Sequence, residues 1–81
     1  FRNLALAGEA LEKGGNLACV MNAANEIAVY AFLKNRINFL DMTTIIEKTM
    51  QQIPFIQSPT LEEYFESDAA ARNFAADQIN L

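Results

Sequence analysis

Three polar residues interrupt an apolar stretch, and their side chains are of kinds that either bind ligands or tie down backbone. Asn22, Asn25 and Glu26 lie within VMNAANEIAVYAF, residues 20–32. At 100° per residue they fall on one side of a helix. A buried carboxamide most often satisfies backbone groups of a nearby loop, and contact with a ligand is the alternative. We interpret the three residues as a structural polar cluster.

The expected partners of this cluster are irregular connections and basic groups. Residues 35–40 and 54–59 must cross apolar surface, and each backbone group buried there without a partner costs about 1–3 kcal/mol. The two asparagines are therefore expected to hydrogen-bond loop backbone inside the domain. Glu26 is expected to accept from a helix cap or from a basic group such as Arg36 or Arg72.

Other residues that could carry chemistry have simpler interpretations. Glu62, Glu63 and Glu66 are interpreted as the solvated face of a short helix. The chain has no histidine, which argues against a zinc site or a Ser-His or Cys-His pair. Its one cysteine, Cys19, lies in an apolar stretch and is interpreted as a small buried hydrophobe in a reducing compartment. No catalytic, cofactor-binding or metal-binding residue is predicted in this chain.

The composition indicates one small globular domain over residues 1–81. Ten acidic residues against six basic ones give a formal charge of −4, which argues against a nucleic-acid partner. No apolar run approaches the roughly 18 residues that cross a membrane, so no membrane contact is expected. The chain begins with Phe1 rather than Met and is expected to be a piece of a longer protein.

The first half of the chain predicts two helices separated by Gly14 and Gly15. Asn3 is the expected N-cap of the first helix, and the glycines end it. Apolar and small residues at i, i+3, i+4 and i+7 are expected to face the core. These residues are Leu4, Ala7, Gly8 and Leu11. The second helix is expected from Asn16 to about Lys34. It is apolar on nearly every face, so it should be central and surrounded by the others.

The third helix is expected to begin with Asp41 as its N-cap and to end before Pro54. Its apolar residues follow one stripe along the helix. They are Met42, Ile45, Ile46, Thr49, Met50 and Ile53.

The last segment opens with Thr60 and Glu63, which form a T-x-x-E capping box. Ser67 and Asp68 have the pattern of a new cap, so this last helix is expected to break near residues 66–67. Its inward residues are expected to be Leu61, Tyr64 and Phe65 before the break and Ala71, Phe74, Ala75 and Ile79 after it. The predicted fold class is all-α, an antiparallel four-helix bundle.

The stretch MNAANEIAVYAFLKNRINFLD, residues 21–41, resembles the signature of the carboxy-terminal domain of 1-deoxy-D-xylulose 5-phosphate reductoisomerase. The matching residues are Asn22-Ala23-Ala24-Asn25-Glu26, Ala31-Phe32-Leu33, Ile37, Phe39, Asp41, Leu61-Glu62, Asp68-Ala69 and Ala71-Arg72, with Leu4, Leu6-Ala7 and Gly14-Gly15 at the start. The resemblance covers essentially the whole chain. Ala18 stands where many members have proline, which concerns only how the second helix begins.

The resemblance implies that residues 1–81 are a helical domain that supports the catalytic domain of a longer enzyme. Members bind NADPH in an amino-terminal domain and hold a divalent metal, Mg²⁺ or Mn²⁺, with the substrate phosphate in a middle domain. The full-length enzyme makes 2-C-methyl-D-erythritol 4-phosphate by rearrangement and reduction in isoprenoid biosynthesis. A cytoplasmic, bacterial, homodimeric enzyme is implied, with its NADPH-binding and catalytic domains absent from this chain.

The N-x-x-x-E spacing of Asn22 and Glu26 imitates the family's N-K-x-x-E motif, but Ala23 stands at the lysine position. We interpret this match as coincidence, so the isolated chain is expected to be inactive. It is also expected to self-associate through the surface that faces the catalytic domain. The alternative function is a free-standing helical protein-interaction module. A second alternative places the polar cluster at the contact with the catalytic domain.

Overall fold

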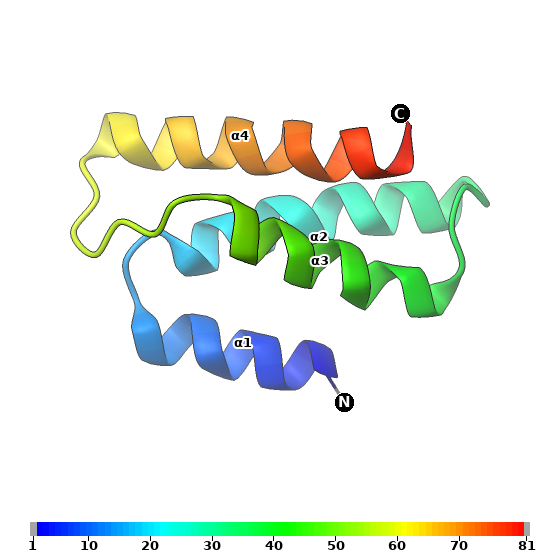
Figure 1. Ribbon diagram of the computed structural model, residues 1–81, viewed down its shortest axis with the longest axis horizontal. Helices are drawn as coiled ribbons and strands as arrows, with labels where there is room; N and C mark the ends of the chain where they lie inside the picture. Colours follow the sequence, from blue (N-terminus) through cyan, green and yellow to red (C-terminus); the bar gives the residue numbers. More distant parts are fainter. Residues whose placement is uncertain (1, 81) are drawn as a thin grey trace.

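A computed structural model describes residues 2–80 of the protein. It contains the helices α1 (Arg2–Lys13), α2 (Leu17–Leu33), α3 (Phe39–Gln52) and α4 (Leu61–Ile79). Successive helices run in opposite directions along the long axis of the molecule (Figure 1). The described residues contain no strand. The all-α antiparallel bundle is therefore confirmed.

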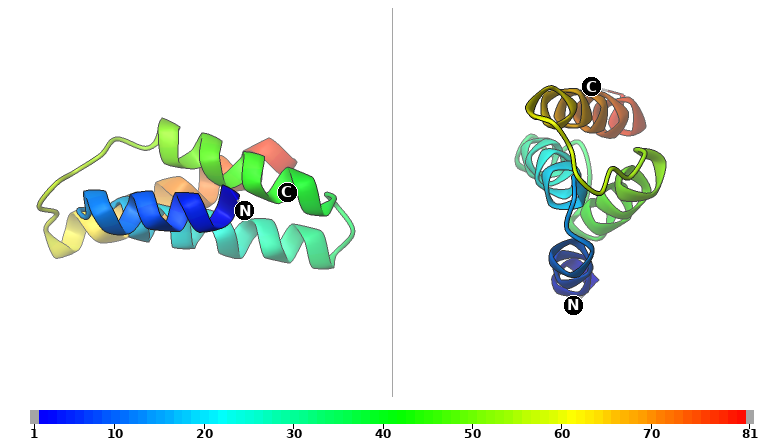
Figure 2. Two further views of the ribbon diagram at one scale, coloured as in Figure 1. Left: turned by 90° about the horizontal axis from the view of Figure 1, so that it is seen from below. Right: turned by 90° about the vertical axis from the view of Figure 1, so that its left-hand side faces the viewer.

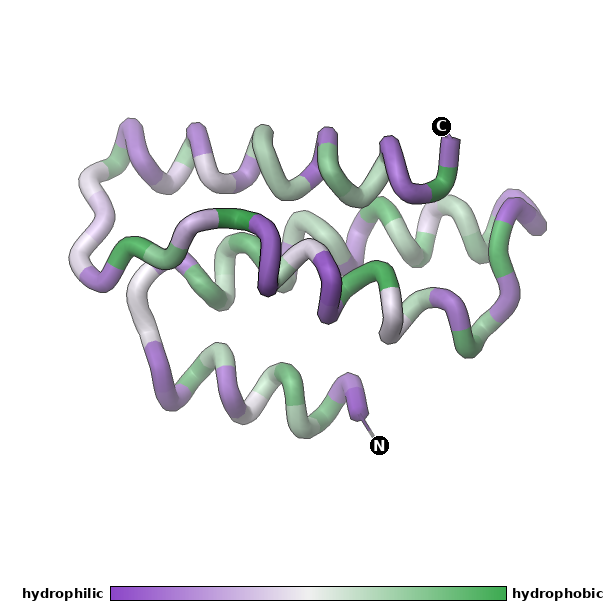
Figure 3. The backbone as a smooth tube through the Cα atoms, viewed as in Figure 1, coloured by the Kyte–Doolittle hydropathy of each residue, from purple (hydrophilic) through white to green (hydrophobic). Residues whose placement is uncertain are grey.

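Helix α2 is the central element, and it contacts α1, α3 and α4. The end-on view shows α2, α3 and α4 as a triangle, with α1 against the side away from α4 (Figure 2). Hydrophobic residues follow one another along most of α2 (Figure 3). Small side chains allow neighbouring helices to approach closely, and the fully buried alanines of α2 and α4 have this role. They are Ala23, Ala24, Ala28, Ala31, Ala71 and Ala75.

The composition of α2 suggested that other helices would cover it on every side. In the structure one side of α2 is not covered. Asn22 and Glu26 are exposed, and Leu33 is 70% exposed at the end of the helix. Helix α1 contacts only α2 and α3, so one face of α2 stays open. The structural polar cluster lies on this open face.

Helix α1 turns the opposite face to the bundle from the one expected. Leu6 and Ala10 are buried, whereas Leu4 is 72% and Leu11 80% exposed. At 100° per residue, Leu4 lies about 160° from Leu6 around the helix. The helix therefore has apolar residues on two sides, and periodicity alone cannot choose between them. Gly8, expected inside, has no atom within 4 Å of an added Cβ.

Two of the predicted caps are wrong by a few residues. Helix α1 begins at Arg2, so Asn3 lies inside it. Helix α3 begins at Phe39, and its N-cap is Asn38, whose Oδ1 accepts from the Asp41 N–H at 2.9 Å. The Asp41 Oδ2 accepts from the Asn38 N–H at 3.1 Å in return. Asp41 therefore completes a capping box instead of serving as the N-cap.

The inward stripe of α3 is confirmed, and the helix ends before Pro54 as predicted. The buried members are Met42, Ile45, Ile46, Thr49 and Met50, and Ile53 is partly buried against them. The hydroxyl of Thr49 donates to the Ile45 carbonyl at 2.7 Å, so this buried polar group is satisfied.

Helix α4 is continuous, so the predicted break near residues 66–67 is wrong. Ser67 is buried in the bundle, and its Oγ accepts from Nδ2 of Asn16 at 2.9 Å. Asp68 accepts from Nε of Arg72, one turn later, at 2.9 Å. Both side chains bind other side chains, so they do not compete for the backbone hydrogen bonds of α4.

The beginning of α4 is capped as predicted. Oγ1 of Thr60 accepts from the Glu63 N–H at 3.1 Å, and Oε1 of Glu63 accepts from the Thr60 N–H at 2.9 Å. Leu61, Tyr64 and Phe65 are exposed, however, so their predicted burial is wrong. The buried row of α4 starts at Ser67 and recurs through Ala71, Ala75 and Ile79 on another side of the helix.

Candidate functional site

Asn16, at the start of α2, has the most hydrogen bonds of any side chain in residues 2–80. It is 1% exposed. Its Nδ2 donates to the Pro54 carbonyl at 3.0 Å and to Oγ of Ser67 at 2.9 Å. Its Oδ1 accepts from the Ile56 N–H at 2.9 Å, and its own N–H donates to the Ile56 carbonyl at 3.0 Å. Asn16 thus joins α2 to the α3–α4 connection and to α4.

Two glycines bring the α1–α2 turn against this connection. Gly14 and Gly15 have φ of +68° and +58°, a left-handed conformation that favours glycine. An added Cβ at Gly15 would lie 2.3 Å from the Ile56 carbonyl oxygen. The sequence signals the turn, but there Asn16 is expected only to begin the second helix. The side chain of Asn16 makes no cap hydrogen bond. Its bonds to the α3–α4 connection and to Ser67 were not predicted from the sequence.

Asn22 and Glu26 form a second polar group, on the open face of α2. Nδ2 of Asn22 donates to Oε2 of Glu26 at 2.9 Å, and Nη1 of Arg72 donates to Oε1 of Glu26 at 3.3 Å. Arg72 lies on α4, so its contact with Glu26 links α2 to α4, and it also binds Asp68 of its own helix. These bonds lower the pKa of Glu26, with Arg72 as the larger cause and Asn22 as the second. Asp68 first, and then Glu26, raise the pKa of Arg72.

The hydrogen bonds expected from Asn22 and Asn25 to loop backbone are absent from residues 2–80. Asn22 binds Glu26 instead, and the structure assigns the half-buried side chain of Asn25 no hydrogen bond among the described residues. Of the two basic partners considered for Glu26, Arg72 makes the contact, whereas Arg36 donates to the Asn80 carbonyl. Asn16, rather than Asn22 or Asn25, makes the expected hydrogen bonds to loop backbone.

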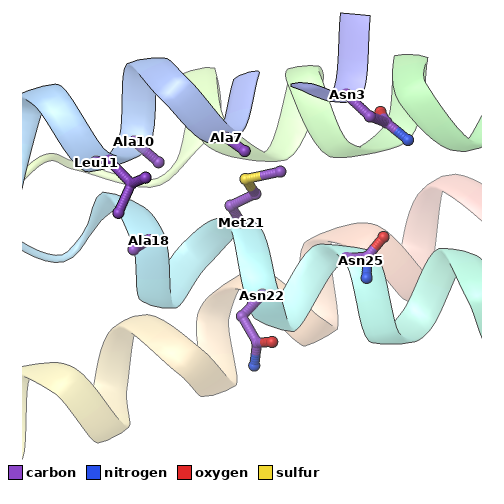
Figure 4. A pocket seen from close by; sticks show the side chains of 8 residues that line it. All are labelled: Asn3, Ala7, Ala10, Leu11, Ala18, Met21, Asn22 and Asn25. Atoms are coloured by element: carbon purple, nitrogen blue, oxygen red, sulfur yellow. The ribbon is translucent and has the colours of Figure 1, made fainter. Parts of the chain in front are cut away.

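A groove of about 350 Å³ runs between α1 and α2 beside this polar group. Its lining residues are all uncharged: Asn3, Ala7, Ala10, Leu11, Ala18, Met21, Asn22 and Asn25. Figure 4 shows Met21 extending from α2 toward Ala7 of α1, with Leu11 facing Ala18 at one end. Oδ1 of Asn3 accepts from the Thr43 hydroxyl at 2.8 Å. The groove is therefore apolar, with carboxamides along α2 and at the amino end of α1.

The other candidate groups are the acidic side chains and the one cysteine. No three His, Cys, Asp or Glu side chains of residues 2–80 are grouped so that they could hold a metal ion. Cys19 is half-buried rather than buried, and its Sγ donates to the Tyr64 carbonyl at 3.6 Å. Burial is the main reason that its pKa is raised, which disfavours the reactive thiolate.

Across residues 2–80, no helix combines the length and the apolar character that crossing a membrane requires.

Comparisons with known proteins agree on one family. A family model described as the DXP reductoisomerase C-terminal domain matches residues 1–74. A 1-deoxy-D-xylulose 5-phosphate reductoisomerase of Bacteroides fragilis is 52% identical over 79 residues, which are 98% of this chain and 20% of the relative. Enzymes of the same name from Phocaeicola vulgatus and Bacillus cereus are 55% identical over 80 residues and 52% over 79. The chain spans about a fifth of the length of these curated relatives.

Proposed function

The chain belongs to the DXP reductoisomerase C-terminal domain family, and we propose that it supports the catalytic part of such an enzyme without supplying reacting groups. The observation that carries this proposal is the family match over residues 1–74, within relatives about five times longer. The site geometry supports it, because the best-connected polar side chain, Asn16, holds the bundle together. The contacts among Asn22, Glu26 and Arg72 likewise join one helix to another.

In this proposal the whole reaction takes place on polypeptide outside this chain. NADPH and a divalent metal, Mg²⁺ or Mn²⁺, bind there. The full-length enzyme is a homodimer that converts 1-deoxy-D-xylulose 5-phosphate into 2-C-methyl-D-erythritol 4-phosphate in isoprenoid biosynthesis. The relatives named above are bacterial, and we place the enzyme in the bacterial cytoplasm. Its catalytic domain is the partner of this helical domain.

A chimera tests the proposal. The stretch of the Bacteroides fragilis reductoisomerase that matches this chain is replaced by residues 1–81, and reductoisomerase activity is measured with NADPH and metal. We expect activity near that of the parent enzyme and none from the isolated chain. A matched control deletes the stretch, which should abolish activity. A folded but inactive chimera, or turnover by the isolated chain, would contradict the proposal.

The alternative, a free-standing interaction module, makes a different prediction for the native protein. An antibody to this domain should detect a polypeptide of about five times 9.0 kDa, because 79 residues are 20% of a relative. A native polypeptide of 9.0 kDa would favour the module.

A further inference from the structure

We propose that the groove between α1 and α2 is the docking surface for an amphipathic helix of the polypeptide that precedes this domain in the enzyme. The inference rests on the proposed function and adds which face of the bundle makes the contact. Its first support is an exposed stripe of α1 beside the groove, in which Leu4 and Leu11 flank Gly8 and Leu11 also lines the groove. The two leucines are 72% and 80% exposed, and an added Cβ at Gly8 would have no atom within 4 Å.

The spacing of this stripe is that of a helix-packing surface. Residues 4, 7, 8 and 11 recur at i, i+3, i+4 and i+7, the pattern of a face that packs against another element. The bundle instead receives Leu6 and Ala10 from the other side of α1. Helix α1 thus has two packing faces, and this domain covers only one of them.

The shape and chemistry of the groove suit a helix. Ala7 and Ala18 leave space between α1 and α2, and Met21 forms an adaptable apolar floor between them (Figure 4). The lining residues carry no charge, so the partner surface should be apolar. The side chain of Asn25 has no hydrogen bond within residues 2–80 and borders the groove, where it can bind polar groups at the edge of a partner helix.

The family indicates which polypeptide can supply the partner helix. The family is that of a carboxy-terminal domain, and the matched residues are a fifth of a relative's length. In such an enzyme the preceding polypeptide arrives at the amino end of α1, where Asn3 borders the groove. A helix from that polypeptide can reach the groove without crossing the bundle. A second copy of this chain is the other occupant that the test must separate.

The test compares α1 in two settings, the isolated chain and the chimera with the Bacteroides fragilis enzyme. Docking should slow amide hydrogen exchange of α1 in the chimera by roughly tenfold or more relative to the isolated chain. Leu11→Glu should remove this protection. Leu40→Glu is the matched control, because Leu40 is also 80% exposed and lies at the start of α3.

A second variant guards against a folding defect. Gly8→Gln has open space for its side chain and should raise the helix propensity of α1, so the isolated chain should stay folded. In the chimera the same side chain should obstruct docking and remove the protection of α1. Loss of protection in both α1 variants, Leu11→Glu and Gly8→Gln, with protection retained in Leu40→Glu, would support the proposal.

The other outcomes overturn it in distinguishable ways. An active chimera in which α1 stays unprotected would reject the groove but leave the proposed function intact. Loss of protection in Leu40→Glu without loss of protection in Leu11→Glu would also reject the groove and leave the proposed function intact. A folded, inactive chimera would reject the proposed function and this inference with it. Concentration-dependent protection of α1 in the isolated chain, removed by Leu11→Glu and absent from the chimera, would assign the groove to a second copy.

Discussion

Two groups of polar side chains on helix α2 illustrate opposite uses of the same residue type. At the start of the helix, Asn16 is buried, and its side chain makes three hydrogen bonds to the rest of the bundle. Two turns later, Asn22 is exposed and binds Glu26 of the same helix, while Asn25 has no hydrogen bond within residues 2–80. The first carboxamide stabilises the fold. Asn22 and Asn25 lie beside a groove that the bundle leaves open. The two groups therefore differ in how far they are buried and not in the chemistry of their side chains.

The largest effect is expected from Asn16→Leu. The change leaves the Pro54 carbonyl, the Ile56 N–H and the Ser67 hydroxyl without this partner, and each buried unmet group costs about 1–3 kcal/mol. We expect a loss of about 3 kcal/mol or more from the roughly 4–12 kcal/mol that scaling by chain length suggests. Urea unfolding followed by circular dichroism measures it. An unchanged midpoint would show that Asn16 does not hold the connection.

Gly15→Ala should have the next largest effect, because it disturbs the contact between the α1–α2 turn and the α3–α4 connection that Asn16 also stabilises. The new Cβ would meet the Ile56 carbonyl oxygen, and φ of +58° adds strain. We expect a loss of about 2–3 kcal/mol. Gly14→Ala is the matched control, since its φ is +68° but nothing lies within 4 Å of its Cβ. It should lose only about 1–2 kcal/mol, so equal losses in the two variants would refute the close approach.

The exposed group should show a small dependence of stability on pH. The folded state lowers the pKa of Glu26 from its ordinary value of 4.5, so the unfolded state binds more protons. The stabilising contribution is complete above that value and disappears as the pH falls through the lowered pKa. Glu26→Gln should therefore flatten the decline of the unfolding midpoint between near-neutral pH and about pH 3.5. Parallel curves for the two proteins would show that the contact with Arg72 does not persist in solution.

The smallest effect is expected from Asn25→Leu in the isolated chain. The sequence alone suggested a loss of about 1–3 kcal/mol, because Asn25 was expected to bind buried backbone. Its half-buried side chain has no such bond within residues 2–80, so we now expect a change within about 0.5 kcal/mol. The same substitution at Asn16 is the matched comparison on one helix. A large loss at Asn25 would mean that the two groups do not differ as described.

Local signals in the sequence determined the elements of this protein. Thr60 and Glu63 lie three residues apart and cap each other, so their box could be recognised without knowing the fold. Pro54 and the stripe of α3 likewise depend only on neighbours along the chain. The same is true of the family, whose signature lies in residues 21–41. Helix type, helix order and family membership were all within reach of the sequence.

Only the tertiary structure decided which faces and which polar groups are buried. Helix α1 has apolar residues on two sides, and contact with α2 and α3 selected Leu6 over Leu4. The Asn16–Ser67 hydrogen bond joins residues 51 positions apart, and it places Ser67 inside a continuous helix where the local pattern suggested a cap. Periodicity and capping rules describe interactions within a few residues, whereas burial is a property of the neighbours that folding brings together.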